Sequence, residues 1–191
     1  MRWLIAVIAA ALLTTWACSG DNSPTGPSAG ASFRLMLKDT PFTDAKAVLV
    51  TFSEVTAHRA TEADFTKVPF AASATSRTCD LKKLQTTQDV LGVGTLPEGH
   101  YTQIRLVVSS ATLYFDNAAT GDACAATIAA PAGRNASLEI PSGEVKLNRQ
   151  FTVPASGSTT MLLDFDGDRS IRETGNGRYM MTPVITVVSV Q

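Results

Sequence analysis

Apolar and polar residues alternate along much of the chain, and a period of two is the pattern of a β-strand with one buried face. The longest such stretch is 96–115, which opens with the turn Pro97-Glu98-Gly99. Its apolar positions are even-numbered up to Val108 and odd-numbered from Ala111 onward. A β-bulge changes the phase of a strand by one residue. We therefore expect a bulge at Ser109-Ser110.

A second long strand is predicted over 47–59, and its phase also slips, at Ser53-Glu54. Two long strands with matching slips are candidates to pair and bend together. Shorter strands are predicted over 33–38, 65–70, 137–140, 145–153, 158–165 and 178–190, whereas 80–85 fits a strand or one helical turn and 89–95 is predicted to be a loop. The pattern predicts an all-β fold, an antiparallel β-sandwich of about eight or nine strands that is immunoglobulin-like or transthyretin-like.

The N-terminal segment has the features of an export signal. Arg2 precedes an apolar run over 3–13, which is too short to span a bilayer and has the length of a signal-peptide core. The sequence Ala17-Cys18-Ser19 then resembles a bacterial lipoprotein signal, in which the cysteine becomes the lipidated N-terminus. The alternative is ordinary secretion, with Thr15-x-Ala17 as the cleavage site.

Three regions follow from this interpretation. Residues 1–17 are a signal peptide, residues 18–32 are the lipidated Cys18 and a flexible tether rich in Ser, Gly and Pro, and residues 33–191 are one β-sandwich domain. We expect an exported protein of the bacterial cell envelope. Ser19 after the cysteine would permit sorting to the outer membrane, so the domain would face the periplasm or the cell surface.

Charge and composition narrow the function. The chain has 16 Lys and Arg against 17 Asp and Glu, and no basic run, so nucleic acid is not an expected partner. Only two histidines are present, and the motifs His-Glu-x-x-His, Gly-x-Ser-x-Gly and the P-loop are missing. We therefore expect a protein that is not an enzyme and needs no cofactor.

The chain has three cysteines. If Cys18 carries lipid, Cys79 and Cys124 remain as an even pair in an oxidising compartment, which predicts a disulfide between them. The alternative is two inert buried thiols.

Two arginines interrupt predicted strands. Arg105 lies mid-strand and Arg149 falls on a predicted inward face. Because a buried arginine must be paired, both are predicted to form structural ion pairs with Asp39, Asp164 or Asp166, and we assign Asp164 and Asp166 to Arg105. The alternative is an arginine directed at an anionic ligand.

Asp164, Asp166 and Asp168 are weak candidates for calcium ligands, because hard cations bind several carboxylate oxygens. The EF-hand pattern fails, since the glycine comes fourth rather than sixth from Asp164 and the twelfth residue is Gly175. We therefore expect no metal here, but a turn in which the aspartates cap the backbone.

Six short motifs follow one another in the order known from one bacterial lipoprotein and surface-protein family. They are Leu37-x-Asp39-x-Pro41, Asp80-Leu81-x-x-Leu84-Gln85, Leu96-Pro97-x-Gly99-x-Tyr101-x-Gln103-Ile104-Arg105-Leu106, Pro141-Ser142-Gly143, Leu163-Asp164-Phe165-Asp166-x-x-x-Ser170-Ile171 and Tyr179-x-x-x-Pro183-Val184-Ile185. Together they resemble the family catalogued as domain of unknown function 4382. The resemblance implies a cell-surface or periplasmic β-domain, and it implies no catalytic residues.

The sequence therefore predicts a non-catalytic, lipid-anchored binding or scaffolding module of the cell envelope. Its expected partners are the membrane, through the anchor, and an unknown envelope protein or glycan. The alternative is a secreted hydrolase whose catalytic residues are dispersed along the chain.

Overall fold

The computed structural model describes residues 30–40 and 44–191, so the predicted signal peptide, Cys18 and most of the tether lie outside the described residues. The strands are β1 (Gly30–Thr40), β2 (Ala47–Arg59), β3 (Phe65–Lys67), β4 (Arg77–Asp80), β5 (Asp89–Pro97), β6 (Gly99–Tyr114), β7 (Cys124–Ala125), β8 (Asn135–Glu139), β9 (Glu144–Val153), β10 (Ser158–Asp166), β11 (Ile171–Gly175), β12 (Arg178–Met181) and β13 (Ile185–Val190). Two 3-10 turns, η1 (Ala71–Ser73) and η2 (Lys83–Gln85), and one helical turn, α1 (Gly167–Ser170), connect them. Within the described ranges, no helix has the length and apolar character needed to cross a membrane.

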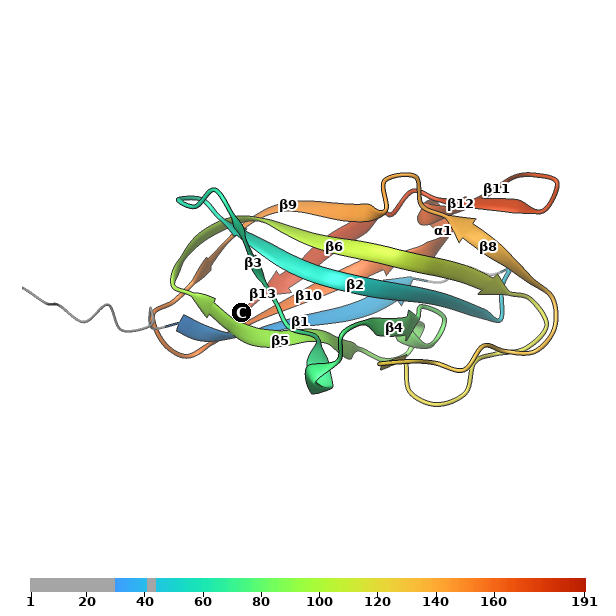
Figure 1. Ribbon diagram of the computed structural model, residues 1–191, viewed down its shortest axis with the longest axis horizontal. Helices are drawn as coiled ribbons and strands as arrows, with labels where there is room; N and C mark the ends of the chain where they lie inside the picture. The colour runs from blue at the N-terminus through green and yellow to red at the C-terminus, as the bar shows by residue number, and fades with distance from the viewer. Residues whose placement is uncertain (1–29, 41–43) are drawn as a thin grey trace, which may run out of the picture.

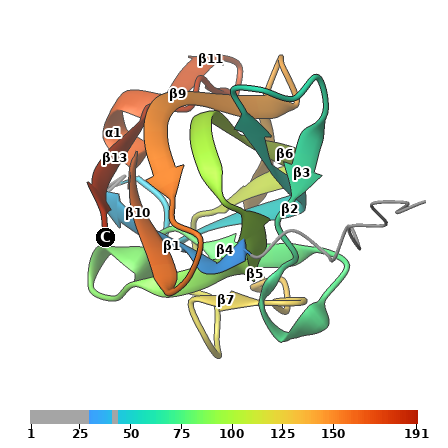
Figure 2. The same cartoon turned by 90° about the vertical axis from the view of Figure 1, so that its left-hand side faces the viewer.

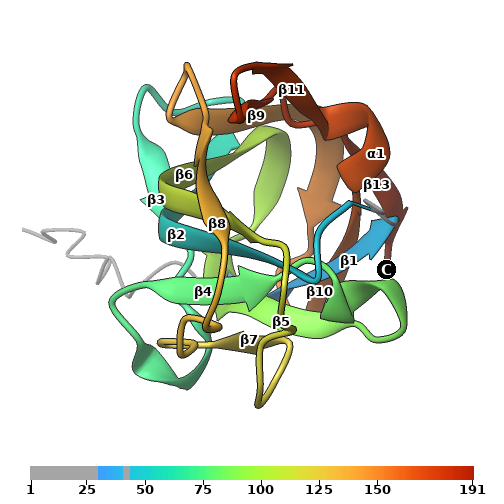
Figure 3. The same ribbon diagram turned by 90° about the vertical axis from the view of Figure 1, so that its right-hand side faces the viewer.

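Two sheets face each other around one core, which confirms the predicted all-β sandwich (Figure 1). The smaller sheet has the order β13-β10-β1-β5. The larger sheet has the order β11-β12-β8-β6-β2-β4-β7, and β3 and β9 join it by pairing with β2 and β6. Views along the long axis show both sheets wrapped around the common interior (Figures 2 and 3).

Alternation in the central strands builds this core. Phe33, Leu35 and Leu37 of β1 are fully buried, as are Leu163 of β10 and Ile104 of β6. Because successive side chains of a strand point to opposite faces, the intervening residues of β1 are half-buried or exposed. The inner faces of the two sheets thus meet as apolar layers, and the alternate side chains lie on their outer faces.

The pairing of the two long strands is as predicted. β2 and β6 run antiparallel from Ala47 opposite Tyr114 to Arg59 opposite Tyr101. Their register shifts between Thr51 and Glu54, where the two phase slips of the sequence meet. The slips are therefore a shared β-bulge that bends the strand pair and keeps apolar side chains inward on both sides of it.

The structure differs from the sequence-based expectation in several elements. The smaller sheet is mixed, because β1 and β10 are parallel, and β12 and β8 are also parallel. The expected loop over 89–95 is strand β5, and the first strand begins at Gly30 rather than Phe33. The last predicted strand is two strands, β12 and β13, which are separated around Pro183, a residue that cannot donate a ladder hydrogen bond.

The turn before β6 explains the spacing Pro97-x-Gly99-x-Tyr101. The buried Tyr101 donates a hydrogen bond from its hydroxyl to the carbonyl oxygen of Pro97, at 2.8 Å. Its ring stacks on Phe151, with 5.1 Å between centroids. Gly99 has a φ of 144°, which favours glycine, and a Cβ there would lie 2.9 Å from Cδ of Arg59. The turn therefore fixes where β6 enters the sheet.

Candidate functional site

Four neighbouring strands, β3, β2, β6 and β9, present an open outer face (Figure 2). In one cross-strand row, His58 of β2 lies opposite Phe65 of β3 on one side and Gln103 of β6 on the other, and Gln103 lies opposite Asn148 of β9. The register of β6 shifts between Tyr101 and Gln103 relative to β9. We call Phe65, His58, Gln103, Arg105 and Asn148 the outer strip.

Arg105 lies at the centre of the outer strip. Its guanidinium carbon is 3.9 Å from the ring centroid of Phe65, and its Nε donates a hydrogen bond to Oε1 of Gln103 at 2.7 Å. The amide of Gln103 in turn donates to Oδ1 of Asn148 at 2.5 Å. The planar guanidinium is thus held on an aromatic ring by one edge. Among the described residues, none accepts a hydrogen bond from its two terminal nitrogens.

The predicted ion pair of Arg105 with Asp164 or Asp166 is wrong. Asp164 pairs with Lys38, at 2.7 Å between Nζ and Oδ2, and Asp166 lies 3.9 Å from Nε of Arg169. Asp164 and Asp166 belong to β10 in the other sheet, whereas Arg105 is half-buried on the outer face of the larger sheet. Arg105 alternates with the buried Ile104 and Leu106, so its side chain lies on the outer face of the sheet.

Two lysines beside the outer strip have carboxylate partners. Lys67 pairs with Glu54 and Lys146 pairs with Glu144, both at 2.6 Å. Lys146 lowers the pKa of the Glu144 carboxyl, and the charge of Arg105 adds to this effect. No carboxylate of the described chain lies within ion-pair distance of Arg105 itself. Arg105 therefore has no carboxylate in direct contact, and its charge reaches Glu144 only at longer range.

Arg149 is exposed, in contrast to the inward position predicted for it. The register shift between β6 and β9 places Phe151 opposite Tyr101 but Asn148 opposite Gln103, so the residues between them lie outside the regular alternation. Arg149 lines a cleft of about 370 Å³ together with Asn148 of the outer strip and Thr186 of β13. The cleft therefore continues the outer strip toward the smaller sheet.

The ends of β1 and β10 form a second polar cluster, which is buried. Asp39 is 6% exposed, and neither of its carboxyl oxygens has a hydrogen-bond partner among the described residues. Burial raises the pKa of the Asp39 carboxyl to about 8, and the charge of Asp164 adds to the rise, while the side chain of Gln85 offsets part of it. This cluster unites residues of three of the family motifs and belongs to the interior rather than to an open site.

Asp164 and Asp166, near α1, form hydrogen bonds and ion pairs within the chain. Asp166 is the N-cap of α1 and accepts a hydrogen bond from the backbone N–H of Arg169 at 3.1 Å. Asp164 accepts a hydrogen bond from Thr40 in addition to its ion pair, and Asp168 is exposed in α1. Over the described ranges, no three His, Cys, Asp or Glu side chains form a group that could hold a metal ion.

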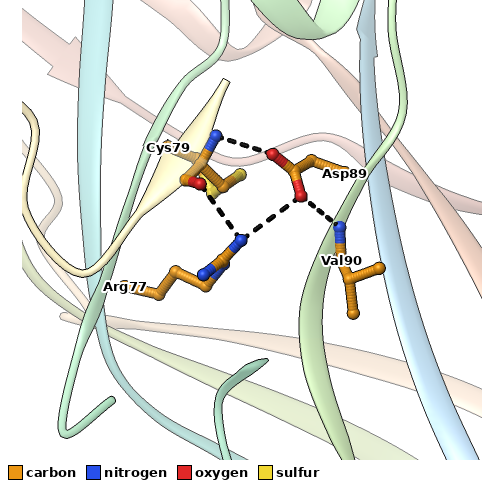
Figure 4. A network of polar contacts seen from close by, with 5 residues as sticks. Arg77, Cys79, Asp89 and Val90 are labelled. Carbon is orange, nitrogen blue, oxygen red and sulfur yellow. Dashed lines mark hydrogen bonds and ion pairs between the residues drawn. A yellow bond between two sulfur atoms is a disulfide. The ribbon is translucent and has the colours of Figure 1, made fainter. Parts of the chain in front are cut away.

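The cysteine pair lies at the edge of the larger sheet. Cys79 of β4 and Cys124 of β7 are directly opposite in register and are joined by a disulfide, as the cysteine count predicted. Figure 4 shows that Arg77 and Asp89 surround this link. Arg77 donates to the carbonyl oxygen of Cys124 at 3.0 Å and lies 3.3 Å from Oδ1 of Asp89, whose other oxygen accepts from the backbone N–H of Cys124 at 2.9 Å.

Sequence reasoning missed this network because β4 has only four residues and all of them are buried, so the strand shows no alternation of apolar and polar positions. The one signal was its spacing, since Arg77 and Cys79 lie on the same face of any strand that contains both. Arg77 is 8% exposed and pairs with Asp89, so the buried, paired arginine that the sequence predicted at position 105 is instead Arg77.

The histidines do not form a catalytic group with an acid in the described part of the chain. Nδ1 of His58 lies 2.9 Å from Oγ1 of Thr102, and its ring packs on Phe65 at 4.7 Å. No described carboxylate contacts the other ring nitrogen. His100 is exposed at the start of β6.

These features define a β-sandwich with one open polar face and a disulfide-linked edge. Residues 30–183 match the family described as "Domain of unknown function (DUF4382)", and the chain belongs to this family. The predicted family is thereby confirmed over nearly the whole described region. No curated protein and no solved structure matches the chain.

Proposed function

We propose that this chain is a non-catalytic binding or scaffolding module of the bacterial cell envelope, held at the membrane by a lipid on Cys18. The observation that carries the binding role is Arg105 on the outer face. Its guanidinium is oriented by Phe65 and Gln103, and its terminal nitrogens remain available to a partner. A guanidinium has five N–H donors, and those that no group of the described chain accepts can bind a partner.

The anchoring part of the proposal rests on the sequence. The segment 3–13 is apolar and Cys18 follows it, while 21–29 is polar and rich in small residues. A domain tethered in this way would expose its outer face to the proteins and glycans of the cell envelope. Replacing Cys18 with Ala should move the protein from the membrane fraction to the soluble fraction of its host. Unchanged fractionation would contradict the anchor and leave the binding role to be judged separately.

The binding role is tested by capture from envelope extracts. The exported protein is immobilised, and the bound material is compared between the unchanged protein and an Arg105→Gln variant. We expect the unchanged protein to retain an envelope component that the variant retains less well. Release of a reaction product from envelope material by the unchanged protein would instead favour the alternative, a secreted hydrolase.

A further inference from the structure

The outer strip continues into the cleft between β9 and β13, and the two form one polar track across the strands. The track begins at Phe65, passes over Arg105 and the amide pair of Gln103 and Asn148, and ends at Arg149 in the cleft. Neighbouring strands are spaced about 4.8 Å apart, so the part from β3 to β9 spans roughly 15 Å. This length suits a short linear polymer.

The charges of the track select an anion. Arg105 and Arg149 have no carboxylate partner among the described residues, whereas Lys67 and Lys146 beside them are neutralised by Glu54 and Glu144. A guanidinium presents parallel N–H donors that match the two oxygens of a carboxylate. Since Nε of Arg105 is already bonded to Gln103, its terminal nitrogens form the available edge.

The uncharged groups of the track favour a saccharide over a peptide. Side-chain amides and a hydroxyl, from Gln103, Asn148 and Thr186, lie along it, and such groups exchange hydrogen bonds with sugar hydroxyls. An extended peptide binds a sheet through the free backbone groups of an edge strand. Most of the track instead crosses the faces of β2 and β6, whose backbone groups are paired on both sides, and only its end in the cleft reaches the edge strands β9 and β13.

We infer that this track binds a linear glycan whose sugar residues carry carboxylate groups, with one carboxylate on Arg105 and the chain extending past Asn148 toward Arg149. The inference rests on the proposed function and specifies its ligand class. Arg105 supplies orientation as well as charge, because Phe65 and Gln103 fix the plane of its guanidinium.

The test uses titration calorimetry of the full-length exported protein, solubilised in detergent, with an oligogalacturonate as the probe. We expect saturable binding that weakens by about tenfold or more when the probe is replaced by its methyl ester, which lacks the charge. Arg105→Gln should weaken binding of the oligogalacturonate to a similar extent. Arg105→Lys should have an intermediate affinity, because lysine keeps the charge but loses the planar donor pair.

Arg134→Gln is the matched control. Arg134 also lies over a phenylalanine ring, 5.1 Å from the centroid of Phe115, but it has a carboxylate partner, with 3.7 Å between its Nε and Oδ1 of Asp116. This variant should bind the probe as the unchanged protein does. The thermal midpoint of each variant shows whether it is folded.

Three outcomes would overturn the inference: no binding of the oligogalacturonate, equal binding of its methyl ester, or tighter binding of poly-glutamate, which would identify an acidic peptide as the ligand. Envelope capture that persists in Arg105→Gln would overturn it as well, yet would leave the proposed binding function standing. If the unchanged protein captures no envelope component at all, the proposed binding function itself is wrong.

Discussion

Two arginines on the larger sheet have opposite surroundings, and their different burial decides what each contributes. Arg77 is 8% exposed and pairs with Asp89, whereas the half-buried Arg105 lies across an aromatic ring on the outer face. An ionised group removed from water is stable only when it is paired, and deletion of its partner leaves an uncompensated charge. An exposed cation–π contact is worth about 1 kcal/mol or less.

Substitution of these two arginines should therefore have unequal effects on stability. We expect Arg77→Ala to lower the free energy of unfolding by about 3 kcal/mol, because Asp89 and the carbonyl of Cys124 lose their donor. Arg105→Ala should cost less than about 1 kcal/mol. Chemical denaturation of both variants measures the difference. Equal costs would show that Arg105 has a structural role comparable to that of Arg77.

Asp39 should make stability depend on pH. Its pKa is raised from 3.8 to about 8 in the folded protein, mainly by burial, so the folded state holds a proton that the unfolded state releases above about pH 4. The contribution of Asp39 to stability is therefore fully present below about pH 4 and falls by about 1.4 kcal/mol for each pH unit as the pH rises toward 8. Burial also raises the pKa of Asp80, which acts in the same direction.

Asp39→Asn should make the free energy of unfolding depend less steeply on pH, by the slope that corresponds to about one proton. The reason is that an amide stays neutral at every pH. Denaturant unfolding at pH 5, 6.5 and 8 would show a flatter slope for the variant than for the unchanged protein, with a residual slope from Asp80. Replacement of the exposed Asp168 by Asn is the control and should leave the slope as it is. If Asp39→Asn has the same slope as the unchanged protein, Asp39 is not protonated in the folded state near neutral pH.

At the scale of elements, the sequence predicted the parts that depend on local alternation. The matching phase slips of β2 and β6 identified both the bulge and the pairing, because burial of one face fixes the register. β5 was missed because Gly92 and Gly94 have the composition of a loop. In the structure these glycines allow close approach instead, since a Cβ on Gly94 would lie 2.6 Å from Cδ of Pro69.

Other features were beyond local reasoning. The parallel pairing of β1 with β10 joins residues more than a hundred positions apart, and nothing in either strand specifies its neighbour. The outer strip likewise depends on register, because Phe65 and Arg105 meet only across β2. The sequence located Arg105 as an unusual residue, but the face on which it lies is set by the sheet.

The turn between β5 and β6 yields a prediction at this scale. Tyr101→Phe keeps the stack on Phe151 and removes the hydrogen bond to the Pro97 carbonyl. We expect a loss of about 1 kcal/mol in the free energy of unfolding, because a typical intramolecular hydrogen bond contributes that much. Tyr179→Phe, at a half-buried ring on β12, is the control and should change stability less. Equal losses would mean that the turn does not depend on this bond.

At the scale of the whole molecule, the two sheets are joined along the side where β5 meets the larger sheet. Phe70 bridges to Gly92, and Val93 donates a backbone hydrogen bond to Pro69 at 2.9 Å. Farther along, Asp89 of β5 accepts from Arg77 and from the backbone of Cys124. The disulfide holds the two-residue strand β7 in this contact, so it stabilises the junction of the sheets as well as one loop (Figure 4).

Removal of the disulfide should therefore weaken the protein without changing its fold. The bridge closes a loop with a sequence separation of 45, for which chain entropy gives an upper value of about 4 kcal/mol. We expect the double variant Cys79→Ala and Cys124→Ala to lose most of that value in denaturant unfolding. Arg77 and Asp89 should retain β7 only partly, because β7 pairs with β4 over two residues.

Mass spectrometry of protein exported by its own host, alkylated under denaturing conditions without reduction, checks the bond directly. Cys79 and Cys124 should carry no alkyl group before reduction and one each afterward. Two alkylated thiols in the unreduced protein would contradict the disulfide. Unchanged stability of the double variant would contradict its role at the junction, and the polar contacts of Asp89 would then be sufficient to join the sheets.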